Sequence, residues 1–325
     1  MRHALHAITE ELRRLKTAGV KTIAVSPDGV AALRALVATR ARSASPSSPA
    51  DDRESATAPS RRAEAHTGSP APVSPPKAYE PPPFTARPAS VGAAPEGLAP
   101  IPEGGPTVSL PEGDKASRWA ALHNLVLNDV TCRAHVRPGK KVVLGVGSLE
   151  AKIMFVGEAP GAEEEVQGEP FVGPAGQLLT KMIQAMGLKR EEVYIGNIMN
   201  WRPELATRGG GEQIGNRPPT EAEMRYCLPY LKAQIEVVNP ELLVALGATA
   251  AQGLLGFGSF KALGDIRGRW QSFASKPLMV TYHPSYILRN QSNRSKRMIW
   301  EDLLKVMERI GLAVSDRQRG YFLDK

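Results

Sequence analysis

The sequence predicts an α/β fold, a three-layer α/β/α sandwich with a central, mainly parallel sheet, preceded by a disordered linker. From about residue 116 onwards, short apolar runs rich in valine and isoleucine alternate with longer segments of helical spacing. Strands that alternate with helices form parallel sheets whose two faces are covered by those helices. The stretch over residues 40–115 is rich in proline, serine and alanine instead, and it buries too little apolar surface to offset its ordering entropy.

The expected elements of the sheet and of its covering layers follow from these runs. Short apolar runs predict strands at 141–147, 152–158, 193–200, 242–247 and 278–284. Segments with helical spacing predict helices at 117–129, 175–188, 219–238, 248–256 and 294–312. Ligands of parallel sheets bind at the carboxyl ends of the strands, so we expect the functional site at that edge.

Composition divides the chain into three parts. Residues 1–39 have the pattern helix, strand, helix and predict a small N-terminal appendage. Residues 40–115 predict the disordered linker, and residues 116–325 predict the main domain. The simplest role of the appendage is docking or oligomerisation, and a protein partner could bind through it or through the linker.

The charge and the cysteine content narrow the class of protein. The chain has 325 residues and a formal net charge of +8, which suits a polyanionic partner such as nucleic acid but is also common in other soluble proteins. Two cysteines do not make a disulfide framework. Because the N-terminus lacks an apolar signal-peptide core and no stretch is long enough to span a bilayer, we expect a cytoplasmic protein without membrane contact. We also expect a monomer.

Residues 157–179, "GEAPGAEEEVQGEPFVGPAGQLL", form the most unusual segment of the chain. The segment is dense in glycine, proline and carboxylates but contains no lysine or arginine. A phosphate-binding loop would normally carry a lysine for its charge. The segment therefore predicts either a neutral ligand or a reaction in which positive charge develops.

Three polar residues lie toward the carboxyl ends of predicted strands, namely Glu158, Asn197 and His283. Taken singly, each has a simpler interpretation: a strand-to-helix turn, a helix cap and a surface histidine. Together with Phe171 they are less ordinary, because they offer a stacking ring, an amide that matches the N3–H/O4 edge of a pyrimidine, a donor for O2 and a carboxylate. Breaking the bond between uracil and deoxyribose needs these parts, since its transition state resembles an oxocarbenium ion that a carboxylate stabilises.

Residues 143–311 resemble the uracil-DNA glycosylase superfamily and are most similar to its family 4. The resemblance rests on three motifs in the family's order, "GEAPG…GEPFVGPAGQLL", "YIGNIMNWRPE…NRPPTEAEMRYCLPYL" and "HPSYILR". It implies a DNA-repair hydrolase that flips uracil out of single- or double-stranded DNA and leaves an abasic site. Residues 116–325 would then be the catalytic domain, with DNA as partner.

The resemblance also implies roles for individual residues. Glu158 would face the water and the sugar and His283 would stabilise the departing anion, as the catalytic pair. Phe171 would stack on the uracil and Asn197 would select its edge. The remaining residues of the substrate pocket would be Gly157, Ala159, Gly161 and Glu164.

Glu164 and the third motif each leave a choice open. Where some related families exclude thymine with a tyrosine, this chain has Gly161, and Glu164 would guard that space. The alternative is that the acidic run 163–165 is a solvated first helical turn. In the third motif, Tyr286, Ile287 and Leu288 are candidates for the wedge that fills the gap left by a flipped base, and Arg289 for a phosphate contact.

The chain departs from family 4 at the ligands of its 4Fe–4S cluster. The resemblance places the four ligands at Cys132, His135, Trp201 and Cys227, so only three could ligate metal. We expect no cluster and no cofactor requirement for the chemistry. Zinc on the remaining sulfur and nitrogen ligands is one alternative, and two buried free cysteines beside a packed tryptophan are another.

Two other functions stay open from the sequence. One is a uracil- or DNA-binding module with reduced catalysis, and the other is a glycosylase for another deaminated base such as hypoxanthine. The covalent branch of the superfamily is disfavoured, because Ala159 replaces its glutamine and the glycine-rich insertion at 204–215 lacks a histidine.

Overall fold

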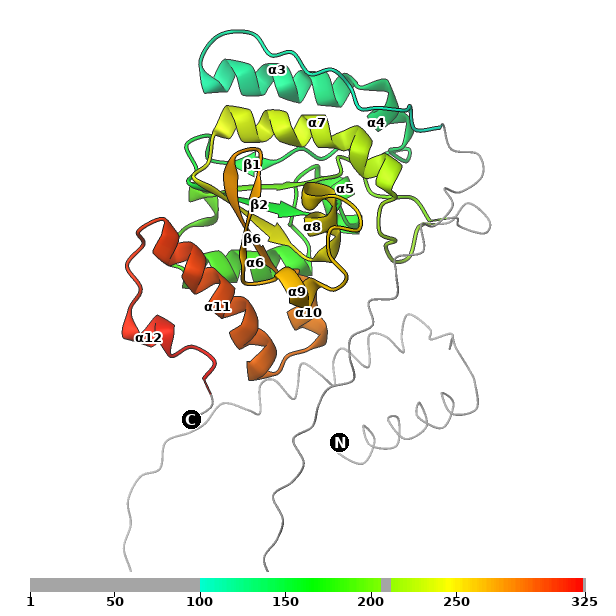
Figure 1. The fold of residues 1–325 in the computed structure, drawn as a ribbon. Helices are drawn as coiled ribbons and strands as arrows, with labels where there is room; N and C mark the ends of the chain where they lie inside the picture. The colour runs from blue at the N-terminus through cyan, green and yellow to red at the C-terminus, as the bar shows by residue number, and fades with distance from the viewer. Residues whose placement is uncertain (1–99, 206–211, 324–325) are drawn as a thin grey trace, which may run out of the picture. The chain divides into compact units, whose positions relative to one another are not determined.

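The computed structural model describes residues 100–205 and 212–323 of the chain (Figure 1). The appendage predicted over 1–39 and the linker as far as residue 99 lie outside the described residues. Within the described part, no helix has the length and apolar character needed to cross a membrane.

A six-stranded sheet in the order β1-β3-β2-β4-β6-β5 forms the centre of the domain. Strands β2, β3, β4 and β6 run parallel, and β1 and β5 pair antiparallel at the two edges. This arrangement confirms the predicted α/β fold with a mainly parallel sheet. The strands are β1 Val146–Gly147, β2 Ile153–Gly157, β3 Tyr194–Asn197, β4 Leu242–Leu246, β5 Trp270–Phe273 and β6 Lys276–Thr281.

Helices cover both faces of the sheet (Figure 1). Helix α7 packs over one face with α3 outside it, while α6 and α11 cover the other face. The longer helices are α3 Lys115–Asn128, α6 Pro174–Ala185, α7 Glu221–Val238, α8 Ala248–Leu255 and α11 Asn293–Arg309. The short ones are α4 Val130–Ala134, α5 Ala162–Gln167, η1 Arg190–Glu192, α9 Leu263–Ile266, α10 Pro284–Arg289 and α12 Asp316–Arg319.

The strand prediction from the sequence was wrong at the two edges of the sheet. Only Val146–Gly147 of the run 141–147 joins the sheet. The preceding residues are fixed by other contacts, since Val143 N–H donates to the Asn200 carbonyl over 2.8 Å and the Val143 carbonyl accepts from Asn200 Nδ2 over 3.1 Å. Strand β5 was not predicted, because its sequence Trp-Gln-Ser-Phe is partly polar and partly exposed, as befits an edge strand.

The packed domain begins earlier than residue 116. Ile101, Val108 and Leu110 pack against the core on the α7 side of the sheet. Gly105 lies so close to α7 that a Cβ there would be 2.6 Å from Pro229 Cγ. The last residues of the expected linker, from residue 100 on, therefore belong to the domain.

Candidate active site

The site is built around Gly157, the last residue of β2, which is in register with Asn197 of the neighbouring parallel strand β3. A Cβ on residue 157 would lie 2.3 Å from Asn197 Oδ1 and 2.5 Å from Phe171 Cζ. The Asn197 amide and the Phe171 ring therefore come together only because residue 157 is a glycine, since any side chain there would fill the space between them. On the other side, the Phe171 and His283 ring centroids are 5.6 Å apart. The structure therefore brings these predicted residues together at the carboxyl ends of the strands.

Phe171 has a left-handed backbone, with φ of 55°, which is strained for a bulky residue. Charged side chains hold the peptide groups on both sides of it. Glu164 accepts from Val172 N–H over 3.0 Å, and Arg190 donates to the Pro170 carbonyl over 2.7 Å. The ring is 6 % exposed, so this clamp fixes a nearly buried stacking surface in one orientation.

Glu164 links that clamp to the "GEAPG" turn. Its carboxylate also accepts from Gly161 N–H over 3.1 Å and Gly173 N–H over 3.0 Å. A Cβ on Gly161 would be 2.6 Å from Glu164 Oε2, so the carboxylate fills the space where a side chain at 161 would project. A solvated first turn does not describe this residue, nor Glu165, which is 4 % exposed. The guard role of Glu164 stays a prediction.

Asn197 is 6 % exposed, and its Oδ1 has no hydrogen-bond partner among the described residues. An unpaired buried amide oxygen costs free energy, about 1–3 kcal/mol, so this atom requires an explanation, of which a donor from a bound ligand is one. Because this oxygen lies beside the Phe171 ring, the missing donor would belong to a group stacked on that ring.

His283 is the N-cap of α10, and the cap determines which ring nitrogen bonds to the helix. Its Nδ1 accepts from the Ser285 backbone N–H over 3.2 Å and lies 2.9 Å from Ser285 Oγ. The neutral ring therefore carries its proton on Nε2, which is left to donate to a ligand. Burial, with a smaller effect of Arg289, lowers the pKa of His283 to about 4, so the ring is neutral at pH 7.

Glu158 follows Gly157 at the end of β2. Burial raises the pKa of its carboxyl, and a hydrogen bond with Thr249 on α8 opposes that shift. Ala159 and Gly161 continue the turn beside it, at intermediate burial. A carboxylate that is partly desolvated in this way interacts more strongly with a positive charge developing nearby than a carboxylate in bulk water does.

Helix α10 separates the wedge candidates. Ile287 is 7 % exposed and packs in the core with α6 and α11, so it points away from the surface and does not fit a wedge. Tyr286 stacks on Tyr282, with ring centroids 4.4 Å apart. Leu288 is 42 % exposed and Arg289 is exposed, whereas Tyr286 is half-buried, so Leu288 and Arg289 are the most accessible of the predicted contact residues.

The residues at the family's cluster positions form a packed core. Cys132 and Cys227 are fully buried free thiols, and the pKa of Cys132 is raised by its neighbour Cys227 and by burial, so this thiol stays protonated. His135 donates from Nδ1 to the Thr131 carbonyl over 2.8 Å. Its ring packs on Trp201, with centroids 5.1 Å apart.

These residues do not fit a 4Fe–4S cluster. Trp201 is 1 % exposed and occupies one ligand position with a side chain that cannot ligate iron. No group of three or more His, Cys, Asp or Glu residues among those described could hold a metal ion. The zinc alternative at Cys132, His135 and Cys227 therefore has no support in the geometry.

Sequence reasoning missed two supports of the site. Arg190 of the clamp comes 19 residues after Phe171 and carries no local signal. Glu165 accepts from both Arg137 and Arg202, and Arg202 Nε donates to Asn216 Oδ1 over 2.8 Å. This buried network links the end of the 204–215 insertion to α5. From the sequence, Glu165 is only one member of the acidic run 163–165.

The fold and the site residues define an α/β protein in which an aromatic ring, a buried amide and a neutral histidine converge at the carboxyl ends of parallel strands. Comparison with known proteins agrees. The profile of the Uracil DNA glycosylase superfamily matches residues 144–304. The chain is 43% identical over 167 residues to the type-4 uracil-DNA glycosylase of Thermotoga maritima, covering 50% of this chain and 80% of that protein.

Two further relatives have the same name. The type-4 uracil-DNA glycosylase of Pyrobaculum aerophilum is 37% identical over 181 residues, which are 54% of this chain and 87% of that protein. That of Saccharolobus solfataricus is 39% identical over 176 residues, 52% of this chain and 76% of that protein. The chain therefore belongs to the uracil-DNA glycosylase superfamily and, within it, to family 4.

Proposed function

We propose that this protein is a uracil-DNA glycosylase, a DNA-repair hydrolase that excises uracil from DNA and leaves an abasic site. The observation that carries the proposal is the unpaired, buried Asn197 Oδ1 beside the Phe171 ring. A uracil stacked on that ring would supply the missing donor through N3–H, while the amide Nδ2 would donate to O4. Cytosine presents an amino donor where uracil has O4, so the same amide would mismatch it.

The remaining residues account for bond cleavage. As the C1′–N1 bond breaks, its electron pair moves into the uracil ring, and the neutral His283 donates from Nε2 to O2, where negative charge develops. The Glu158 carboxylate stabilises the positive charge on the sugar. Water then adds its oxygen to C1′, and the loss of its proton is balanced by the proton that the uracil anion takes up, which gives free uracil and an abasic sugar. Every protein group in these steps is a side chain of this chain, and the family's cluster takes no part in them.

The experiment that tests the function is uracil release from single- and double-stranded oligonucleotides, with and without a chelator. Purified protein should release uracil in both conditions, as shown by alkaline cleavage of abasic sites. Asn197→Asp should lower kcat/KM on uracil by about 10- to 100-fold, the worth of one good base-edge pair, because an ionised carboxylate lacks the donor to O4. Absence of release by folded wild type on either substrate, with retained DNA binding, would favour the binding module instead; preferential release of hypoxanthine would assign another base.

The rate of uracil release should depend on pH through the ionisation of the Glu158 carboxylate. Its pKa is raised above the ordinary value of 4.5, and only the ionised form stabilises a cation, so the rate should fall as pH drops through that raised pKa. Protonation of His283, expected only near pH 4, would place a proton on Nδ1 and remove its bond from Ser285 N–H, which should add a second loss there. The rate of uracil release is measured against pH for wild type and for Glu158→Gln. The variant should be slower, and its rate should lack the fall that the wild type shows at the raised pKa of Glu158. The same fall in rate in both proteins would show that Glu158 takes no part in the mechanism.

A further inference from the structure

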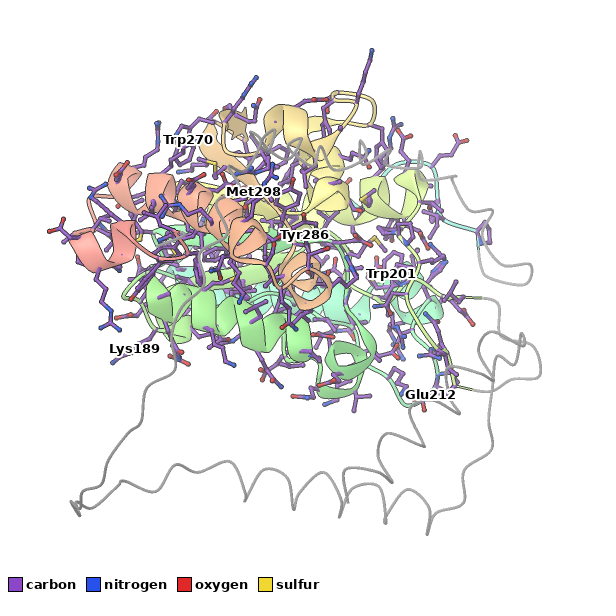
Figure 2. The ribbon with its side chains drawn as sticks, turned by 90° about the horizontal axis from the view of Figure 1, so that it is seen from below. Lys189, Trp201, Glu212, Trp270, Tyr286 and Met298 are labelled. Atoms are coloured by element: carbon purple, nitrogen blue, oxygen red, sulfur yellow. The ribbon has the colours of Figure 1, made fainter. Side chains whose placement is uncertain are left out.

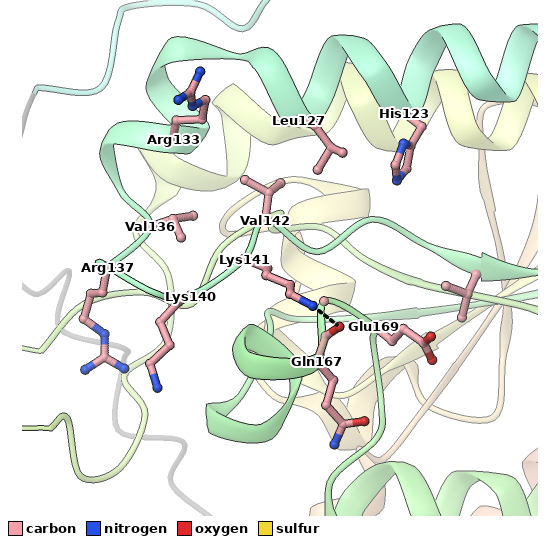
Figure 3. Close-up of a pocket in the computed structure, with 12 residues that line it drawn as sticks. His123, Leu127, Arg133, Val136, Arg137, Lys140, Lys141, Val142, Gln167 and Glu169 are labelled. Carbon is pink, nitrogen blue, oxygen red and sulfur yellow. Dashed lines mark hydrogen bonds between the residues drawn. The ribbon is translucent and has the colours of Figure 1, made fainter.

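A hollow lies between α3, α4 and the C-terminal end of α5, and none of the candidate site residues line it (Figure 3). Its volume is about 680 Å³. Leu127, Val136 and Val142 form apolar parts of its wall. The charged side chains around it are Arg133, Arg137, Lys140 and Lys141, with Glu169 as the acidic residue of the lining. We call this hollow with its four cations the basic groove.

The positive charge of the basic groove is only partly neutralised by the protein. Glu165 binds Arg137 but also Arg202, so one carboxylate serves two guanidinium groups. Lys141 Nζ bonds to the Gln167 carbonyl over 3.3 Å, which leaves its charge unpaired by that contact. The Lys140–Glu212 pair, at 3.2 Å, has a 77% exposed carboxylate, and exposed pairs are weak. An anion could therefore enter without breaking a strong ion pair.

Helix α5 connects the basic groove to the active site. It begins directly after Gly161 of the "GEAPG" turn and ends at Gly168, where a Cβ would lie 2.9 Å from Lys141 Cδ. Six helical residues span about 9 Å, or roughly three nucleotides at 3.4 Å each. A strand that places its uracil at Phe171 would therefore bring flanking phosphates within reach of the groove.

We infer that the basic groove binds the phosphates of the DNA strand on one flank of the target nucleotide, a few nucleotides from it. The inference rests on the proposed function, because the position of the uracil sets the path of the strand. Arg289, which is exposed at the end of α10, would serve another part of the strand. An array of arginine and lysine beside an apolar wall suits a polynucleotide, whose backbone is uniformly anionic.

The test is a pair of double variants with equal charge change. Arg133→Ala/Lys141→Ala removes two exposed cations of the groove. Lys181→Ala/Lys189→Ala removes two exposed cations elsewhere, and Lys189 lies at the far end of the domain from Glu212 (Figure 2). Binding of fluorescent uracil DNA of 20 and of 5 nucleotides is measured over a range of salt, with melting temperatures as the check on folding.

The groove variant should bind the 20-nucleotide DNA about tenfold more weakly than wild type at low salt, and its salt slope should be smaller by about 1–2. The loss should be smaller on 5-nucleotide DNA, which reaches less of the groove. Equal losses in the control variant, or an unchanged salt slope, would overturn the inference. If the wild type releases no uracil but the groove still governs DNA affinity, the proposed function fails and the groove stands. Normal uracil release, together with unaltered DNA binding by the groove variant, would instead support the proposed function and overturn the groove.

Discussion

Replacement of His283 by alanine is expected to lower the rate of uracil release by a factor of about 10²–10³ at pH 7, the usual cost of removing one donor to a developing oxyanion. The physical reason is the tautomer set by the α10 cap. Because Ser285 N–H occupies Nδ1, the proton of the neutral ring is on Nε2, where it can reach uracil O2. Single-turnover assays with excess enzyme measure the chemical step directly, without product release.

Ser285→Ala is the matched control. It removes the hydroxyl 2.9 Å from Nδ1 but keeps the backbone donor, so the tautomer and most of the rate should survive. Fluorescence titration with uracil DNA should show that His283→Ala still binds, because the anion forms only as the bond breaks. A rate within threefold of wild type for His283→Ala would contradict the assigned role, and a large loss in Ser285→Ala alone would show that the hydroxyl is the important group.

The edge of the sheet that carries the site could be predicted from sequence for a simple reason. Glu158, Asn197 and His283 each follow an uninterrupted apolar run, and runs of that kind form parallel strands whose carboxyl ends meet. That rule does not predict that Gly157 and Asn197 lie in register. Pairing register depends on contacts between segments 40 residues apart, which no local pattern encodes.

The geometry of Phe171 could not be predicted for the same kind of reason. Its left-handed backbone depends on Glu164 and on Arg190, and the latter reaches back to the Pro170 carbonyl from the far side of α6. Local propensity argues against such a conformation for phenylalanine, so only tertiary contacts can impose it. The wedge was ambiguous for a different reason: neighbouring apolar residues of a short helix point to different sides, and the sequence alone does not say which of Ile287 and Leu288 faces inward.

Replacement of Trp201 by alanine is expected to lower the free energy of unfolding by about 3–5 kcal/mol, the range for deletion of a large buried side chain. Trp201 is 1 % exposed, and its ring packs between those of His135 and Tyr226, at centroid distances of 5.1 and 6.3 Å. Because the residues around the family's cluster positions do not fit a cluster, this packing holds together the region where α4 meets α7. Urea unfolding of the domain, followed by circular dichroism, measures the loss.

Trp201→Phe separates the ring from its polar atom. Trp201 Nε1 is buried without a hydrogen-bond partner among the described residues, so phenylalanine removes that cost while keeping most of the apolar packing. Its loss should therefore be well below that of alanine. If a metal stabilised this region instead, chelation would lower the melting temperature of the wild type, iron or zinc would copurify near stoichiometry, and Cys132→Ala would release it. A melting temperature insensitive to chelator, together with a large loss in Trp201→Ala, assigns the stability of the region to aromatic packing.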